Sequence, residues 1–149
     1  MNKPSFVYVT YIRSTPEKVW DAITDRAVSG QYWGGGCHMN VSDWKVGSKW
    51  EHQRNDGSAV VDIIGTVIES NRPGRLVITW AAPSEARDPE KTSRVVFEIE
   101  SHKNDVVRLT VTHSELEPGS DMLRGISSGW PLVLSSLKSF LETGQVVPK

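Results

Sequence analysis

The segment from Ser120 to Glu142 constrains the fold most, because its apolar residues repeat with the spacing of one helix face. Steps of four and three separate Met122, Ile126, Trp130, Val133, Leu137 and Phe140. This spacing predicts a long amphipathic helix, and Gly144 is a suitable C-terminal stop. Pro131 lacks a backbone N–H and crowds the preceding turn, so we expect a kink there or a fresh helix start near Ser128.

Most of the chain before this helix has the alternation typical of β-strands. The expected strands are Phe6–Ile12, His38–Trp44, Ser48–Arg54, Ala59–Ser70, Arg75–Ala82, Thr92–His102 and Val106–Glu115. Turn signals at Asn55–Gly57 and Lys103–Asp105 predict hairpins, and consecutive hairpins make an antiparallel meander. The alternation fails around Gly65, where we expect a bulge or sharp bend. The polar stretch Pro83–Lys91 is typical of an exposed loop.

Two short helices are expected between the first two strands. Thr15-Pro16-Glu17 carries a capping residue, a proline suited to the first turn and a favourable acidic group. A second helix over Asp25–Trp33 is interrupted by Gly30 and ended by Gly34–Gly36. The chain is therefore an α+β protein in which the long helix is the element large enough to cover one face of the sheet.

Composition sets outer limits on organisation and partners. The 149 residues are the size of one domain, which we place over 1–149. Lys and Arg number 17 against 18 Asp and Glu, a balance that argues against a dedicated nucleic-acid binder. A single cysteine, Cys37, excludes an internal disulfide and fits a reducing compartment. Without a long apolar run or a signal peptide, we expect no membrane insertion and a cytoplasmic location.

Three stretches of the sequence resemble one known superfamily. They are Thr15–Asp25 with Tyr32-Trp33; Val46–Trp50 with Gly65–Glu69, Arg75–Val77 and Thr79-Trp80; and Gly129–Pro131 with Leu134–Lys138 and Leu141–Gly144. Together they resemble the START-like (SRPBCC) superfamily, and within it the family related to the activator of the heat-shock protein 90 ATPase. The resemblance implies a helix-grip fold, in which a curved antiparallel sheet of six to seven strands wraps around a long C-terminal helix. Two short helices would follow the first strand, and a cavity for an apolar ligand would lie between sheet and helix.

Strand alternation indicates which side chains face the long helix. His52 and His113 fall by parity on the face otherwise filled by Trp50, Trp80 and apolar residues. A buried polar group without a partner costs about 1–3 kcal/mol, so each histidine must be paired, wet or at a cavity mouth. Apolar walls with a few convergent polar groups are typical of small-molecule sites, although the same rings could simply fill a core. The candidate ligand-binding residues are Trp33, Trp50, His52, Trp80, Phe97, Leu109, His113, Trp130, Leu134 and Leu137.

No linear motif for catalysis, metal or cofactor binding stands out. Cys37 and His38 are neighbours whose side chains point to opposite faces of a strand, and the four histidines lack metal-ligand spacing. Asp62 and Glu69 are interpreted as isolated carboxylates on a solvated face. No cofactor or metal is therefore expected.

Three hypotheses about function follow. The favoured one is binding of a small hydrophobic ligand, which would be lipid-like, aromatic or polyketide-like. The alternative is a cyclase or dehydratase acting on a polyketide-like substrate, with His113 or His52 as general acid–base. The third is a module that interacts with the heat-shock chaperone ATPase, ranked last because one short domain has no second module to clamp a large partner.

Overall fold

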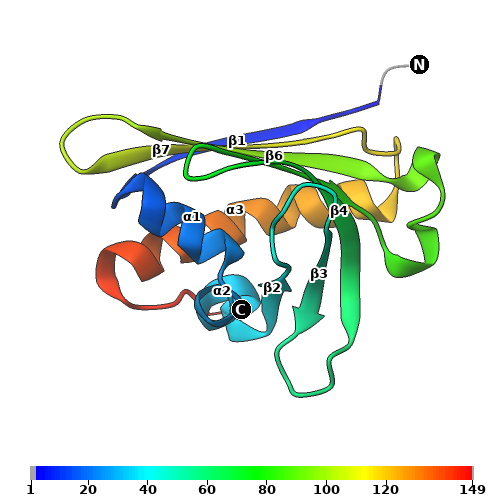
Figure 1. Ribbon diagram of the computed structural model, residues 1–149, viewed down its shortest axis with the longest axis horizontal. Helices are drawn as coiled ribbons and strands as arrows, with labels where there is room; N and C mark the ends of the chain where they lie inside the picture. The colour runs from blue at the N-terminus through cyan, green and yellow to red at the C-terminus, as the bar shows by residue number, and fades with distance from the viewer. Residues whose placement is uncertain (1–2, 149) are drawn as a thin grey trace.

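Seven strands form one antiparallel sheet in the order β1-β7-β6-β5-β4-β3-β2 (Figure 1). The computed structural model describes residues 3–148. The strands are β1 (Phe6–Arg13), β2 (His38–Val41), β3 (Lys49–Arg54), β4 (Val61–Asn71), β5 (Arg75–Trp80), β6 (Ser93–Ser101) and β7 (Val106–Ser114). The predicted meander is confirmed from β2 to β7, and β1 adds to its far edge by pairing with β7.

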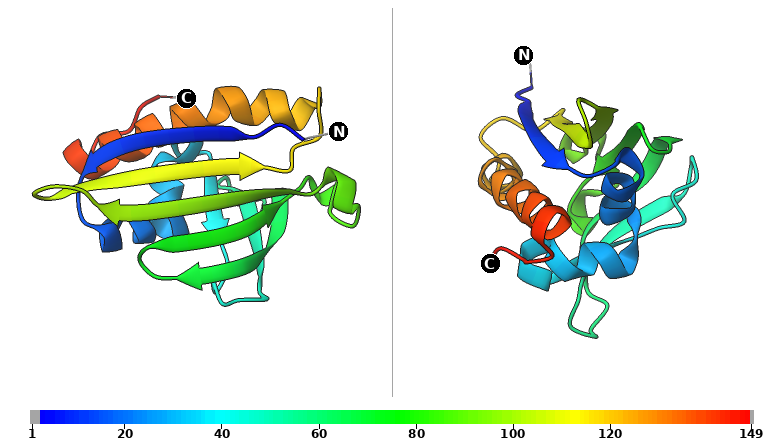
Figure 2. Two further views of the ribbon diagram at one scale, coloured as in Figure 1. Left: turned by 90° about the horizontal axis from the view of Figure 1, so that it is seen from above. Right: turned by 90° about the vertical axis from the view of Figure 1, so that its left-hand side faces the viewer.

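The helices are α1 (Pro16–Thr24), α2 (Arg26–Tyr32) and α3 (Asp121–Thr143). Thr15 and Asp25 cap the first two helices through their side-chain oxygens, as their residue types favour. The Ser120 hydroxyl accepts from the Leu123 N–H at 3.1 Å, and Gly144 ends α3 with φ 77°. Helix α3 lies across the concave face of the curved sheet, and α1 and α2 lie beside its C-terminal half (Figures 1 and 2).

Two sequence-based boundaries need correction. Helix α3 continues through Pro131, so the fresh start near Ser128 is wrong. Trp130 and Leu134 flank the proline and are both buried against the sheet, which keeps the helix intact despite the lost hydrogen bond. Strand β2 ends at Val41 rather than Trp44, because Trp44 has φ 60° and its N–H is taken by the Ser42 hydroxyl.

The sheet curls at Gly65, where the sequence predicts a break. A Cβ at this position would lie 1.9 Å from the Thr79 carbonyl oxygen and 2.5 Å from the Trp50 indole nitrogen. That space is occupied by a hydrogen bond, since Trp50 Nε1–H donates to Thr79 O at 2.7 Å. Register shifts flank the position, between His52 and Gln53 on β3 and between Val67 and Glu69 on β4. The bend turns β2 to β4 around the N-terminal half of α3 (Figure 2).

The core lies between the sheet and α3, and the predicted inward faces are confirmed. The inward residues of β3, β5, β6 and β7 are all buried: Trp50, His52, Leu76, Ile78, Trp80, Val95, Phe97, Ile99, Val107, Leu109, Val111 and His113. The stretch Pro83–Lys91 forms two short 3-10 turns on the surface, as the loop prediction requires. Within the described part of the chain, no helix combines the length and apolar character needed to cross a bilayer.

Candidate ligand-binding site

An open cavity of about 480 Å³ lies between the N-terminal half of α3 and the curled part of the sheet. We call it the aromatic cavity. Its lining residues are Trp33, His38, His52, Ile63, Trp80, Ala82, Glu85, Asp121, Met122, Gly125, Ile126, Gly129, Trp130 and Val133. The volume falls within the usual range for small-molecule sites, about 300–1,000 Å³.

Two glycines on α3 leave part of this space open. Gly125 and Gly129 are one turn apart, so they lie on the same face of the helix, and both line the cavity. A Cβ added at either position would meet nothing within 4 Å. Glycine in a helix interior costs about 1 kcal/mol relative to alanine. Gly125 is exposed and Gly129 is half-buried, so the helix carries two unfavourable residues where the cavity meets solvent.

Three tryptophans form the walls. Trp130 of α3 meets Trp33 with ring centroids 5.8 Å apart and Trp80 of β5 at 5.6 Å. Such tilted and edge-to-face contacts are the favoured geometry for aromatic pairs. The Trp80 indole N–H donates to the Met122 sulfur at 3.3 Å. A thioether is a weak acceptor, so this donor is held loosely at the edge of the cavity.

His52 stands on the cavity wall with a fixed ring orientation. Its Nδ1 lies 2.8 Å from Asn40 Oδ1, and the Asn40 amide nitrogen donates to Ile23 O at 2.9 Å. Because the amide nitrogen faces a carbonyl, the amide oxygen faces His52, so Nδ1 carries the proton and Nε2 carries a lone pair. Burial lowers the pKa of His52 to about 3, with a further lowering from the neighbouring His38 and an opposing effect of Asp62. The ring is neutral at physiological pH.

His113 is closed off from the cavity. The Trp130 indole N–H donates to its Nδ1 at 3.0 Å, and its Nε2 lies 2.7 Å from the Ser93 hydroxyl oxygen. That hydroxyl donates to Trp80 O at 2.9 Å, so it accepts from Nε2–H of His113. Both ring nitrogens are therefore occupied, the residue is fully buried, and burial lowers its pKa to about 3. This geometry leaves His113 no free ring nitrogen for the general acid–base role that the sequence suggested for His113 or His52.

Asp62 is not the isolated carboxylate that the sequence suggested. One of its oxygens accepts from His38 Nε2 at 2.9 Å, and both accept from the Arg54 guanidinium at 2.9 and 3.0 Å. These hydrogen bonds, led by Arg54, lower the pKa of Asp62 to about 2. The His38 ring stacks on His52 with centroids 4.6 Å apart and planes 6° apart. A carboxylate-oriented histidine thus borders the cavity.

Of the ten candidate residues, four line the aromatic cavity: Trp33, His52, Trp80 and Trp130. The other six lie in the solid core and are at most 1% exposed: Trp50, Phe97, Leu109, His113, Leu134 and Leu137. The sequence reasoning did not include His38, Met122 and the two glycines among the site residues. A signal for the glycines was present, since two glycines four residues apart inside a predicted helix are unfavourable without a reason.

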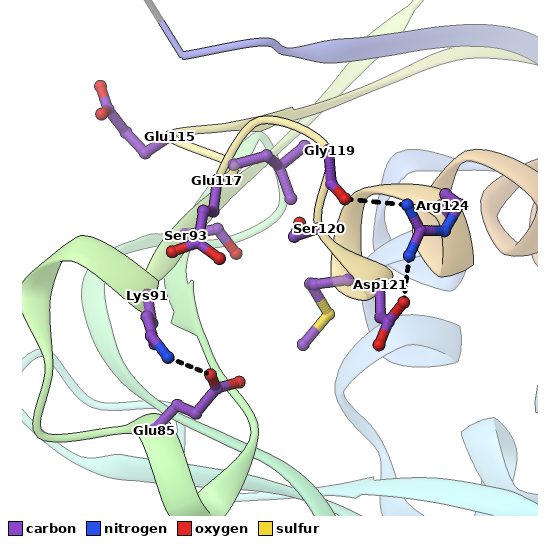
Figure 3. Close-up of a pocket in the computed structure, with 11 residues that line it drawn as sticks. Glu85, Lys91, Ser93, Glu115, Glu117, Gly119, Ser120, Asp121 and Arg124 are labelled. Atoms are coloured by element: carbon purple, nitrogen blue, oxygen red, sulfur yellow. Dashed lines mark hydrogen bonds and ion pairs between the residues drawn. The ribbon is translucent and has the colours of Figure 1, made fainter.

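A second, polar pocket of about 360 Å³ adjoins the cavity and shares Glu85, Asp121 and Met122 with it (Figure 3). Lys91 pairs with Glu85 at 3.3 Å, and Arg124 pairs with Asp121 while donating to Gly119 O at 2.8 Å. The acidic groups nearest the cavity are thus already paired with cations. Across residues 3–148, no group of three or more His, Cys, Asp or Glu side chains is arranged to hold a metal ion.

Comparison with known families agrees with this architecture. The sequence profile described as "Activator of Hsp90 ATPase homolog 1-like protein" matches residues 13–142. The chain belongs to this family. The START-like resemblance and the helix-grip fold are thereby confirmed. No curated protein sequence matches the chain.

Solved structures share the fold of this Hsp90-activator-like chain. An HSP90 activator from Plasmodium falciparum is 24% identical with a TM-score of 0.72, and the match covers 92% of this chain and 95% of that one. The Aha1 dimer from Colwellia psychrerythraea is 20% identical with a TM-score of 0.72, covering 95% and 98%. CalU16 from Micromonospora echinospora is 19% identical with a TM-score of 0.70, covering 95% and 78%. At these identities the likeness concerns the fold alone.

Proposed function

We propose that this protein binds a small, mostly apolar molecule in the aromatic cavity. The observation that carries the proposal is the pair Gly125 and Gly129, which leave space beside three tryptophans. A helix that only had to cover the sheet would gain stability from larger side chains at both positions. The apolar walls would supply affinity, and the few polar groups would orient the ligand.

Titration with a panel of fatty acids, flavonoids and polyketides, followed by NMR, tests this proposal. We expect at least one class to shift the indole N–H resonances of Trp33, Trp80 and Trp130. Gly129→Leu should abolish the shifts because its side chain enters the cavity, whereas Ser135→Leu places the same side chain on the exposed face of α3 and should leave them unchanged. If no compound moves these resonances in the wild-type protein, the proposal is rejected.

A second candidate function is catalysis on a polyketide-like substrate, and one observation favours it. Asp62 orients the His38 ring at the cavity wall, an arrangement suited to a general base. The sequence suggested His113 or His52 for this role; because both ring nitrogens of His113 are hydrogen-bonded, His38 joins His52 as a candidate. Dehydration or cyclisation assays with the wild-type protein and His38→Gln test it, since turnover that survives this substitution would rule out His38 as the base.

A third candidate, interaction with the heat-shock chaperone, rests on family membership. The match to the Plasmodium protein described as an HSP90 activator covers 95% of that chain, so small size does not argue against such a role here. Measuring the ATPase rate of the purified chaperone with and without this protein decides the question. No change in rate, together with no co-purification, would remove this candidate. A cytoplasmic location is part of the same proposal.

A further inference from the structure

The polarity of the aromatic cavity restricts the chemistry of its ligand. The side-chain amide of Asn40 holds the His52 ring. This amide cannot rotate by 180° without losing its hydrogen bond to Ile23, because its oxygen would then face the Ile23 carbonyl. The Asn40 backbone is held as well, since its N–H donates to the Ser29 hydroxyl at 3.0 Å. The neutral tautomer with a lone pair on Nε2 is therefore built into the structure.

This lone pair faces the cavity. Among residues 3–148, every fully buried side-chain nitrogen or oxygen has a hydrogen-bond partner. Nε2 of His52 has no partner in that set, so it retains accessible surface although the residue as a whole is only 7% exposed. Since His52 lines the aromatic cavity, its accessible atom opens into that space.

An apolar ligand would displace the water that Nε2 can otherwise bind. A buried acceptor left without a donor costs free energy comparable to a lost hydrogen bond, so a ligand with a donor at this point is favoured. His38 needs a hydrogen bond from the ligand less than His52 does, because its side chain is 25% exposed and water can reach it.

A negatively charged ligand is disfavoured at the same point. None of the described residues that line the cavity is Lys or Arg, and the nearest cations, Lys91 and Arg124, are already paired with Glu85 and Asp121 at its edge. A carboxylate would face the His52 lone pair, and its charge would lose hydration without gaining a cation. Proton uptake by His52 would not compensate near neutral pH, because burial holds its pKa at about 3.

We infer that the aromatic cavity selects an uncharged molecule with a hydroxyl or similar donor, and that this group donates a hydrogen bond to Nε2 of His52. The inference rests on the proposed function and narrows it to phenols and alcohols rather than fatty acids. His52 is then a ligand-binding residue, and Asn40 is the residue that positions it.

Calorimetric titration at pH 7 with three probes of one shape tests the inference. 2-Naphthol carries the donor, 2-methoxynaphthalene lacks it, and 2-naphthoate carries a negative charge. We expect 2-naphthol to bind about tenfold more tightly than the methyl ether, with 2-naphthoate weakest. Equal affinity of 2-naphthol and the ether, or tightest binding of 2-naphthoate, would overturn the inference while leaving cavity binding intact. Failure of all three probes and of the wider panel would instead reject the proposed function.

Substitution assigns the acceptor. In His52→Phe a phenyl ring replaces the imidazole and the acceptor is lost, so the preference for 2-naphthol over the ether should disappear while the ether still binds. His102→Phe makes the same substitution at an exposed histidine outside the cavity, so it is the matched control and should retain the preference. The wild-type protein provides an independent test. The ¹⁵N chemical shift of His52 Nε2 should be that of an unprotonated ring nitrogen, and it should change when 2-naphthol binds but not when the ether binds. A persistent preference in His52→Phe, or a protonated Nε2 in the free protein, contradicts the assignment.

Discussion

The two halves of helix α3 cover the same sheet in different ways. In the C-terminal half, Leu134 and Leu137 are 1% exposed and Phe140 stacks on Tyr32 of α2 with centroids 5.7 Å apart. In the N-terminal half, Gly125 and Gly129 leave open space. The amphipathic pattern is continuous through both halves, so the difference comes from the missing side chains at the exposed Gly125 and the half-buried Gly129, and from the short helices that support only one half.

The two inward histidines repeat this contrast. His113 uses both ring nitrogens in hydrogen bonds to Trp130 and Ser93, and it belongs to the closed core. His52 uses one nitrogen with Asn40 and leaves the other open to the cavity. Both rings are buried and neutral, yet one completes an internal network while the other is available to a ligand.

Acid should destabilise the protein through both histidines, and this is the largest expected effect. Burial lowers each pKa from 6.5 to about 3, so between these values the unfolded chain binds protons that the folded chain does not. The unfolding free energy therefore falls as pH falls through this window, by about 2 kcal/mol per histidine between pH 7 and pH 5 and about 4 kcal/mol for both. Urea unfolding at the two pH values measures it.

A variant separates the contribution of the open site from that of the core. His52→Phe should remove about half of the pH dependence, leaving the part that belongs to His113. The Asp62 carboxyl does not contribute to the difference in stability between pH 7 and pH 5. Its pKa is lowered from 3.8 to about 2, so the stability that it gives the folded protein is lost only at more acidic pH. A wild-type protein whose stability is equal at pH 7 and pH 5 would contradict the burial of both rings.

Truncation should cost more in the closed half of α3 than in the open half. Leu137→Ala removes a side chain that is 1% exposed and should lower the unfolding free energy by about 3 kcal/mol. Met122→Ala enlarges a space that already exists and should cost less than about 1 kcal/mol. Urea unfolding of both variants at pH 7 gives the comparison, and equal losses would show that the two halves are packed alike.

The sequence predicted the architecture because its patterns report which face of an element is covered. Parity placed Trp50, His52 and His113 on the inner face, and the break at Gly65 marked the bend. Parity contains no information about depth, so it could not separate the cavity wall at His52 from the solid core at His113. The sequence also could not predict the pair between Asp62 and His38, because it joins strands β4 and β2, which are not neighbours in the sheet.

Alanine substitutions at Gly65, Gly125 and Gly129 test the open space directly. We expect the smallest changes in stability at the two positions on α3. Gly125→Ala and Gly129→Ala should each stabilise the protein by up to about 1 kcal/mol, because the added methyl groups meet no atoms and the helix gains propensity. Gly65→Ala should have the opposite sign, since its Cβ would collide with the Thr79 carbonyl and the Trp50 indole. Thermal and urea unfolding of the three variants measures the difference. Loss of stability in both α3 variants would mean that the N-terminal half of the helix is as tightly packed as the bend at Gly65, and the cavity would lose its structural basis.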